Sequence, residues 1–322
     1  MFGLKKKMHL TLELNDYVLR SLTKGGNEDA TWNIAEFALP FGLIEDASIA
    51  DEMSLFELLK ENMKKIASKN QPVRIFVPDT SVLLKTFEHP PTIKPEELQG
   101  YVQMELGRTI HLPFQDPLVD VYDPTPNDGH ATLFAVPPEE VGKFVDILQD
   151  LDLQPEVADI RALCNLRFLE RMERLEQNKT YLIADWSINE LRICIYSSGN
   201  VEFLRFQSID TDLNKWVATE HENEVDFKYG GDINDYMTRI TDQVLELDRI
   251  LNFFRFSLHK GEKSVDEMIM MGDNPYLQQI SDIIRENINT PLQIIDDAVI
   301  QAHYPQFKAK HASLIGLALK EV

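Results

Sequence analysis

Two segments far apart in this chain have similar sequences, and each has the pattern of a strand, a turn and a second strand. They are residues 10–20 (LTLELNDYVLR) and 182–192 (LIADWSINELR). Aligned without a gap, they pair Leu10 with Leu182, Glu13 with Asp185, Leu19 with Leu191 and Arg20 with Arg192. A supersecondary unit that recurs at such a distance predicts a protein of two similar lobes. No other feature of the sequence limits the possible folds as strongly.

Length and charge narrow the class of protein. The chain has 322 residues, enough for about two domains, and a net charge of -21. A nucleic-acid partner is not expected, because phosphate binding requires a basic surface. No segment approaches the ~18 consecutive apolar residues of a membrane span, so no transmembrane segment is expected. Cys164 and Cys194 lie in apolar segments, which indicates buried thiols in a reducing cytoplasm rather than a disulfide.

Turn residues and hydrophobic periodicity indicate an inserted unit between the first copy of the repeat and the second. Pro95 and two following acids begin a helix that we expect to end near Thr109. Two strands and another helix, ending near Leu151, complete an αββα pattern. The expected parts are a first lobe beginning at 1–83, an inserted subdomain at 84–157, helices at 158–180 and 300–322 that complete or bridge the first lobe, and a second lobe at 181–299.

The second lobe contains two further features. Between Ser208 and Asp235 there are eight acidic and two basic residues, which predicts an exposed and mobile excursion. A long helix is expected over about Ile233 to Leu258, with an aromatic stripe of Phe253, Phe254 and Phe256 near its end. Core packing is the expected role of this stripe, and a partner-binding surface is the alternative.

Several motifs, in this order, resemble those of the PilM-type proteins of type IV pilus assembly, which are relatives of the cell-division protein FtsA. The strand 73–78 (VRIFVP) resembles the family's "valP" segment, and Glu96–Leu98 with the helix end 110–114 (IHLPF) resembles its "eEL…ylPf" pattern. The remaining matches are Asp120–Tyr122, 151–155 (LDLQP, with Asp152 replacing a glycine) and 315–319 (IGLAL). The resemblance covers nearly the whole chain. It implies an α/β (α+β), two-lobed actin-like (ribonuclease H-like) fold with the αββα insertion in the first lobe.

The resemblance also identifies where a nucleotide would bind. Actin-like proteins hold a triphosphate between two β-turns that normally read Asp-Ile-Gly, and they place a Gly-Gly pair near the adenine. The corresponding residues here, which would contact a nucleotide only if one binds, are Glu13, Asn15, Asp185, Ser187, Gly272 and Asp273.

These positions have lost the residues that phosphate binding needs. Asn15 and Ser187 replace the glycines whose bare backbone approaches phosphate. Asp273 brings a carboxylate towards a polyanion. The eight histidines are scattered without ligand spacing, so no metal site is expected. We therefore expect a degenerate ATPase fold with no catalytic residues and no cofactor, and ATP with Mg²⁺ remains the alternative.

By resemblance, the expected function is a scaffold of type IV pilus or competence-type machinery at the cytoplasmic face of the inner membrane. It would bind the N-terminal cytoplasmic tail of a single-span, PilN-like membrane protein, between the first lobe and the insertion. We place the docking groove near Tyr101, Val102, Met104 and Glu105. Other pilus platform proteins or the assembly ATPase are further candidate partners. The alternative is an active actin-like ATPase that acts as a nucleotide-dependent filament or switch; a sugar or acetate kinase would need intact phosphate turns.

Overall fold

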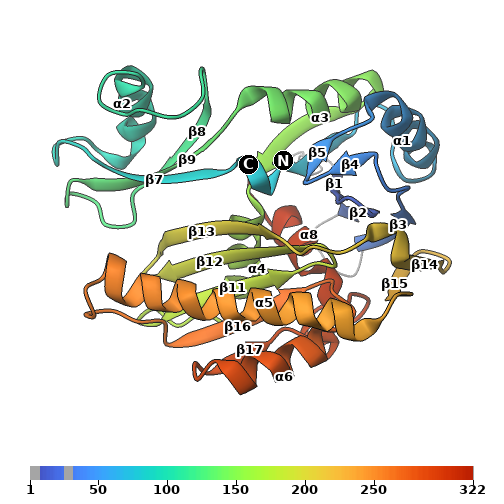
Figure 1. Cartoon of the computed structure of the whole chain (residues 1–322). Coiled ribbons are helices and arrows are strands. Elements are labelled where there is room, and N and C mark those ends of the chain that lie inside the picture. Colours follow the sequence, from blue (N-terminus) through green and yellow to red (C-terminus); the bar gives the residue numbers. More distant parts are fainter. Residues whose placement is uncertain (1–7, 25–31, 322) are drawn as a thin grey trace.

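The computed structural model describes residues 8–24 and 32–321. Its first lobe is built on a five-stranded sheet with the order β10-β6-β1-β2-β3 (Figure 1). Strands β1, β2 and β3 form an antiparallel meander, and β6 and β10 continue the sheet in parallel with β1. The strands are β1 (His9–Leu14), β2 (Val18–Lys24), β3 (Trp32–Ala38), β6 (Pro72–Phe76) and β10 (Gln154–Asp159).

The second lobe repeats this arrangement. Its sheet has the order β13-β12-β11-β16-β17, again with three antiparallel strands followed by two parallel ones. The strands are β11 (Thr180–Trp186), β12 (Glu190–Ser197), β13 (Asn200–Ser208), β16 (Glu267–Gly272) and β17 (Leu292–Ile294). Strands β1–β2 and β11–β12 are the two copies of the sequence repeat, so the prediction of two similar lobes is confirmed.

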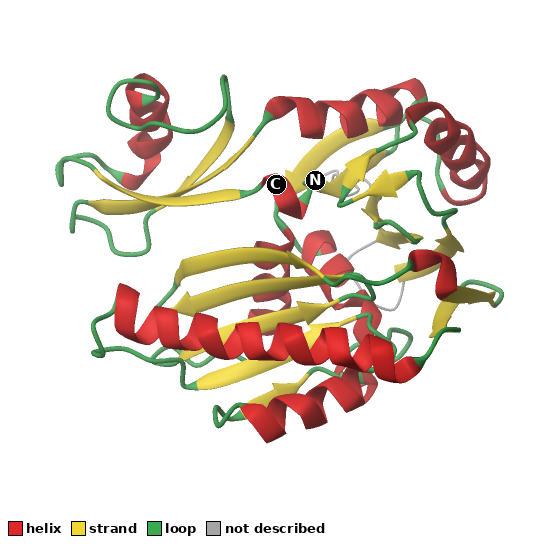
Figure 2. Ribbon diagram, in the orientation of Figure 1, coloured by secondary structure: helices red, strands yellow, loops and turns green. Residues whose placement is uncertain are grey.

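Helices cover the outer faces of both sheets and fill the space between them (Figure 2). Helices α1 (Glu52–Ile66) and α3 (Pro138–Asp150) pack on the first sheet. Helices α5 (Ile233–Asn252) and α6 (Leu277–Asn287) pack on the second. Helices α4 (Arg161–Arg171) and α8 (Ala312–Ala318) contribute to a core that both lobes share. The two lobes are therefore joined by continuous apolar packing.

The insertion is smaller than the sequence suggested. It consists of a three-stranded antiparallel sheet, β7-β9-β8, with the short helix α2 on one face. Helix α3 and strand β10 fall within the expected range 84–157 or begin in it, but they belong to the first lobe. Phe144 and Leu148 of α3 belong to the same apolar cluster as Leu10 of β1, and β10 pairs with β6. The elements are β7 (Leu83–Glu88), α2 (Leu98–Glu105), β8 (Leu118–Tyr122) and β9 (His130–Val136).

The acidic segment after Ser208 is ordered, which corrects the expectation of a mobile excursion. It forms a hairpin of β14 (Trp216–Glu220) and β15 (Val225–Tyr229). Trp216 packs against Tyr229 and Tyr236 with ring centroids 5.2 and 5.0 Å apart. These aromatic contacts hold the hairpin on the second lobe despite its acidic composition. Among the residues that the structure describes, no helix combines the length and apolar character that crossing a membrane requires.

Candidate functional site

The two turns of the repeat face each other where the lobes meet. The first turn is 15–17, between β1 and β2, and the second is 187–189, between β11 and β12. They touch directly, because the side-chain amide of Asn189 donates a hydrogen bond of 2.8 Å to the carboxylate of Asp16. In an actin-like protein this is the space that the nucleotide phosphates would occupy.

Tyr17, the last residue of the first turn, inserts its side chain into the second lobe. Its ring is buried in the second-lobe core and packs edge-on against Phe227, with ring centroids 5.0 Å apart. Its hydroxyl donates a hydrogen bond of 2.7 Å to Asp273, at the end of β16. This contact fixes the spacing between the lobes on the side where a nucleobase would lie.

Arg161, at the start of α4, fills the space beside the first turn. It donates to Glu13 at 2.5 Å and to the side-chain oxygen of Asn15 at 3.1 Å. It also donates to Asp79 at 3.1 Å, and its guanidinium lies over the ring of Phe76 at 4.2 Å. Two residues expected to face phosphate therefore bind an arginine of the same chain instead.

Arg192 has the same role beside the second turn. It donates to Ser187 at 2.8 Å and forms an ion pair with Glu190. It also donates to Asp79 at 2.6 Å, so Asp79 of the first lobe joins Arg161 and Arg192. The side chain of Arg192 is 10% exposed, so this ion pair between lobes is largely withdrawn from water.

Arg20, on β2, completes the network. It contacts Glu13 at 3.3 Å and reaches across to Asp273 at 2.8 Å. Burial alone would raise the pKa of Glu13, but the charges of Arg161 and Arg20 outweigh burial and lower its pKa to about 2. Glu13 is therefore ionised and already neutralised by cations of the chain.

Asp185, the counterpart of Glu13 in the repeat, has a different environment. It accepts a hydrogen bond of 2.9 Å from the amide of Asn165 on α4. Burial raises the pKa of Asp185, although the charges of Arg192 and Arg161 oppose this effect. The two acids occupy matching positions, but only Glu13 has a direct arginine ion pair in the part of the chain that the structure describes.

Gly272 has a role in packing the backbone. A Cβ atom there would lie 2.2 Å from the carbonyl oxygen of Trp186, and its φ of +122° favours glycine. The backbone N–H groups of Asp273 and Asn274 both donate to that same oxygen at 3.0 Å. The glycine that survives from the adenine-side loop thus allows β16 to approach β11 closely.

The space beside the candidate nucleotide residues is small at the first turn and larger elsewhere between the lobes. The cavity beside the first turn, between Asn15, Arg161 and Arg192, has a volume of about 20 Å³. That volume accommodates about one water molecule. Larger cavities, of about 350 and 610 Å³, lie beside Asp185 and beside Gly272 with Asp273. The arginines that could bind phosphate already have carboxylate partners, and Asp273 is engaged by Arg20 and Tyr17. Within the described residues, no cluster of histidine, cysteine or acidic side chains is arranged to hold a metal.

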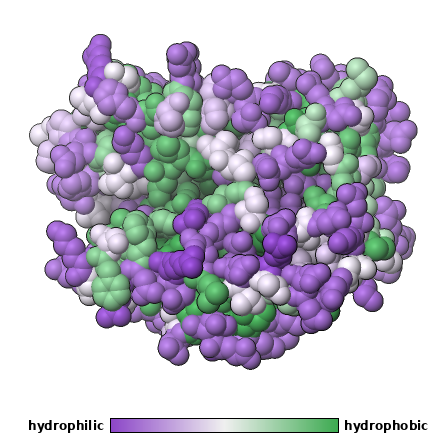
Figure 3. Space-filling view, viewed as in Figure 1, coloured by the Kyte–Doolittle hydropathy of each residue, from purple (hydrophilic) through white to green (hydrophobic). Residues whose placement is uncertain are grey.

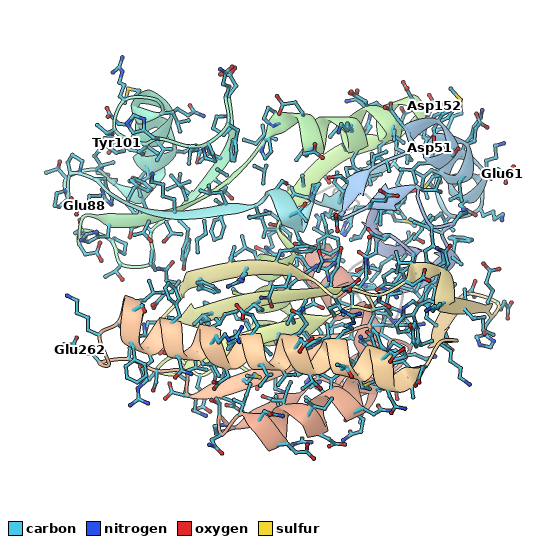
Figure 4. All side chains as sticks on the ribbon, in the orientation of Figure 1. Asp51, Glu61, Glu88, Tyr101, Asp152 and Glu262 are labelled. Atoms are coloured by element: carbon cyan, nitrogen blue, oxygen red, sulfur yellow. The ribbon has the colours of Figure 1, made fainter. Side chains whose placement is uncertain are left out.

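The expected docking residues on α2 separate into two groups. Val102 is fully buried and packs against the sheet of the insertion, so it supports the helix from inside. Met104 is 64% exposed, and Tyr101 and Glu105 are partly exposed. Tyr101 lies on the far side of the insertion from α3 and the first lobe (Figure 4).

Sequence reasoning missed the arginines at the interface between the lobes. The repeat contained the signal, because it aligns Arg20 with Arg192. Strand register pairs Glu13 with Arg20 in one lobe and Asp185 with Arg192 in the other. Arg20 does pair with Glu13, whereas Arg192 pairs with Asp79 and Glu190, so the repeat indicates the buried arginines but not all of their partners.

The duplicated sheets, the helices between them and the facing turns define a protein of the actin-like ATPase fold. Solved structures with this fold resemble the chain over nearly its whole length. One is the "PilM–PilN type IV pilus biogenesis complex", with a TM-score of 0.75, 18% identity and 97% of each chain covered. Others are EutJ from Carboxydothermus hydrogenoformans (TM-score 0.53, 9% identity, 98% of this chain and 90% of that chain) and MreB5 of Spiroplasma citri bound to AMPPNP (0.50, 11%, 98% and 96%).

Comparison of the sequence with known families assigns the chain to one of them. The family "Type IV pilus assembly protein PilM" matches residues 21–321, and the chain belongs to this family. No curated protein sequence matches it. The expected family and the expected actin-like fold are thus confirmed.

Proposed function

We propose that this chain is a scaffold of type IV pilus or competence-type machinery, and that it works with its lobes closed and without nucleotide. The carrying observation is the interface between the lobes, where Arg161 and Arg192 hydrogen-bond to Asn15 and Ser187, the residues that replace the glycines of the two phosphate turns. The family and the similarity to the PilM–PilN complex support a role in holding a PilN-like membrane protein. Such a partner would place the chain at the inner face of the cell membrane, where platform proteins or the assembly ATPase could also bind.

The partner's N-terminal tail would dock at the insertion. Apolar side chains are exposed there on neighbouring elements: Met104 on α2, and Leu118 and Tyr122 on the edge strand β8, which are 64%, 48% and 50% exposed. Gln99 of α2 donates to a backbone carbonyl of β8 at 2.7 Å, so the two elements are held side by side. In Figure 3, hydrophobic surface gathers over the part of the insertion that lies next to the first lobe, whereas the insertion's outer edge and most of the remaining face are hydrophilic. The acidic chain suits a tail with basic residues.

The test measures the affinity of the full chain for a fluorescent peptide with the tail's sequence. Met104→Glu and Leu118→Glu place charges on exposed positions and are expected to weaken binding at least ten-fold. Met53→Glu, on α1 and 80% exposed, is the matched control and should bind like the wild type. Equal affinity in all four proteins would contradict docking at the insertion. Point substitutions are preferable to deleting 84–157, because the deletion would remove α3 from the first-lobe core.

A further inference from the structure

An apolar tip projects from the end of the long helix α5. The helix continues into a π-helical turn, Phe253–Leu258, at one extremity of the molecule (Figure 1). Phe253, Phe256 and Leu258 are 43%, 57% and 45% exposed. Among the described residues, no phenylalanine outside this turn is a strongly exposed one. We call Phe253, Arg255, Phe256, Leu258 and Lys260 the aromatic tip.

The helix geometry explains why these side chains face water. Along α5 the buried side chains recur at helical spacing, and Phe254 continues that stripe into the core with no exposure. Its neighbours Phe253 and Phe256 are consequently turned outwards. Below them, the ring of Phe254 contacts His259 at 4.5 Å, and His259 lies 2.8 Å from Glu202 on β13. The tip is thus fixed to the second sheet, and π-helical turns of this kind are frequent at functional sites.

The charges at the tip differ from those of the chain as a whole. The chain has 53 acidic and 32 basic residues, yet Arg255 and Lys260 form no ion pair with any carboxylate that the structure describes. Arg255 lies over the ring of Phe256 at 4.9 Å, so a cation and an exposed aromatic ring form one unit. The exposed acids that follow the tip in the sequence are Glu262, labelled in Figure 4, and Asp266.

The size of the tip argues against a stable protein interface. An aromatic side chain has roughly 200 Å² of surface, so three side chains that are about half exposed offer roughly 300 Å². A stable protein partner requires about 800 Å² on each side. A bilayer has no such requirement, because exposed aromatic side chains at an extremity can enter the headgroup region while cations meet phosphate groups.

We infer that the aromatic tip is a phospholipid-contacting surface. Phe253, Phe256 and Leu258 enter the boundary between headgroups and acyl chains, and Arg255 and Lys260 bind lipid phosphate. The acidic charge elsewhere on the chain does not prevent this contact, because charges more than about 8 Å from the surface are screened at physiological salt. The contact is weak alone. It adds to any attachment through a membrane-anchored partner, since a second link raises the overall affinity.

The experiment uses the full chain without any partner protein, so its outcome is independent of the proposed tail binding. Vesicles of phosphatidylethanolamine and phosphatidylglycerol are sedimented with the protein, and the bound fraction is measured. We expect the wild type to bind and Phe253→Ser/Phe256→Ser to reduce the bound fraction at least five-fold. Arg255→Glu/Lys260→Glu should reduce it at least three-fold. Met53→Ser/Lys64→Glu, an exposed pair on α1, is the matched control and should bind like the wild type.

Three results would overturn the inference. The first is a wild-type protein that stays in the supernatant. The second is binding that the tip variants leave unchanged, which would assign lipid contact to another part of the chain. The third is a wild-type dimer in light scattering that becomes a monomer in Phe253→Ser/Phe256→Ser, which would make the tip a contact between two copies.

Discussion

At the scale of single residues, buried arginines set the charge balance of the interface between the lobes. Arg161 and Glu13 have side chains that are each 4% exposed. Burying such charges costs free energy that only close, well-satisfied pairing offsets. The pair is therefore weak evidence for extra stability, but removing one partner leaves the other as an uncompensated buried charge.

Replacing Arg161 by alanine should destabilise the fold by about 3–5 kcal/mol, because Glu13 and Asp79 lose a buried cation. Urea unfolding of the full chain measures this change. Arg249→Ala is the matched control, since Arg249 is 75% exposed in its ion pair with Glu246, and it should cost less than about 1 kcal/mol. An equal loss of unfolding free energy in the two variants would show that the buried ion pairs stabilise the fold no more than an exposed pair.

The lowered pKa of Glu13 predicts a pH dependence. Its pKa falls from 4.5 to about 2 on folding, so the folded state favours the ionised form. The resulting stabilisation, about 3 kcal/mol, is present above pH 4.5 and is lost as the pH falls towards 2. The stability difference between the wild type and Glu13→Gln should therefore shrink between pH 5 and pH 3. A difference that stays constant over this range would refute the assigned ionisation.

Individual residues also show where sequence reasoning about the site stopped. The six candidate nucleotide residues were found from the repeat and the family, and the structure brings them together between the lobes. Arg161 could not be found in the same way, because it comes from a helix outside the repeat and its role depends on how α4 enters the interface. Long-range placement of this kind leaves no local pattern.

At the scale of elements, helices α4 and α8 approach each other closely because a glycine, Gly316, lies where they cross. A Cβ atom on Gly316 would lie 2.0 Å from the carbonyl oxygen of Cys164. The sequence showed Gly316 only as part of the family-like segment 315–319. Its physical reason, a close approach of two helix backbones, became visible in the fold.

Gly316→Ala should force α4 and α8 apart and destabilise the fold by at least about 2 kcal/mol. Gly142→Ala provides the matched control on α3, where nothing lies within 4 Å of the new Cβ atom. That substitution should be neutral or stabilising by up to about 1 kcal/mol, because alanine favours helix. Chemical denaturation of both variants compares them, and a harmless Gly316→Ala would contradict the packing described.

Strongly patterned elements were predictable, and elements whose placement depends on the rest of the fold were not. The repeated strands and the apolar stripe of α5 were read from periodicity. The amphipathic pattern of α3 predicts a helix but does not show which sheet its apolar face covers. The expected limits of the insertion therefore included α3, which packs on the first-lobe sheet. For β14 and β15, acidic composition concealed two aromatic residues that anchor the hairpin.

At the scale of the whole molecule, the contacts between lobes suit a rigid body. Asp273 joins both lobes, since it accepts from Tyr17 at 2.7 Å and pairs with Arg20 at 2.8 Å. Asp273→Asn should weaken both contacts and speed amide hydrogen exchange in the turn 15–17 at least ten-fold. Asp282→Asn, on the surface of α6, is the control and should leave this exchange unchanged. Unchanged exchange in Asp273→Asn would show that other contacts hold the lobes together.

The central claim is that the chain's own arginines replace nucleotide between closed lobes. The most direct measurement is the melting temperature of the full chain with MgATP increased into the millimolar range. A ligand at ten times its dissociation constant would add about 1.4 kcal/mol, which raises the melting temperature of a chain of this size by about 2 °C. We predict no change beyond that caused by Mg²⁺ alone. A saturable rise of about 2 °C or more with MgATP would contradict the claim.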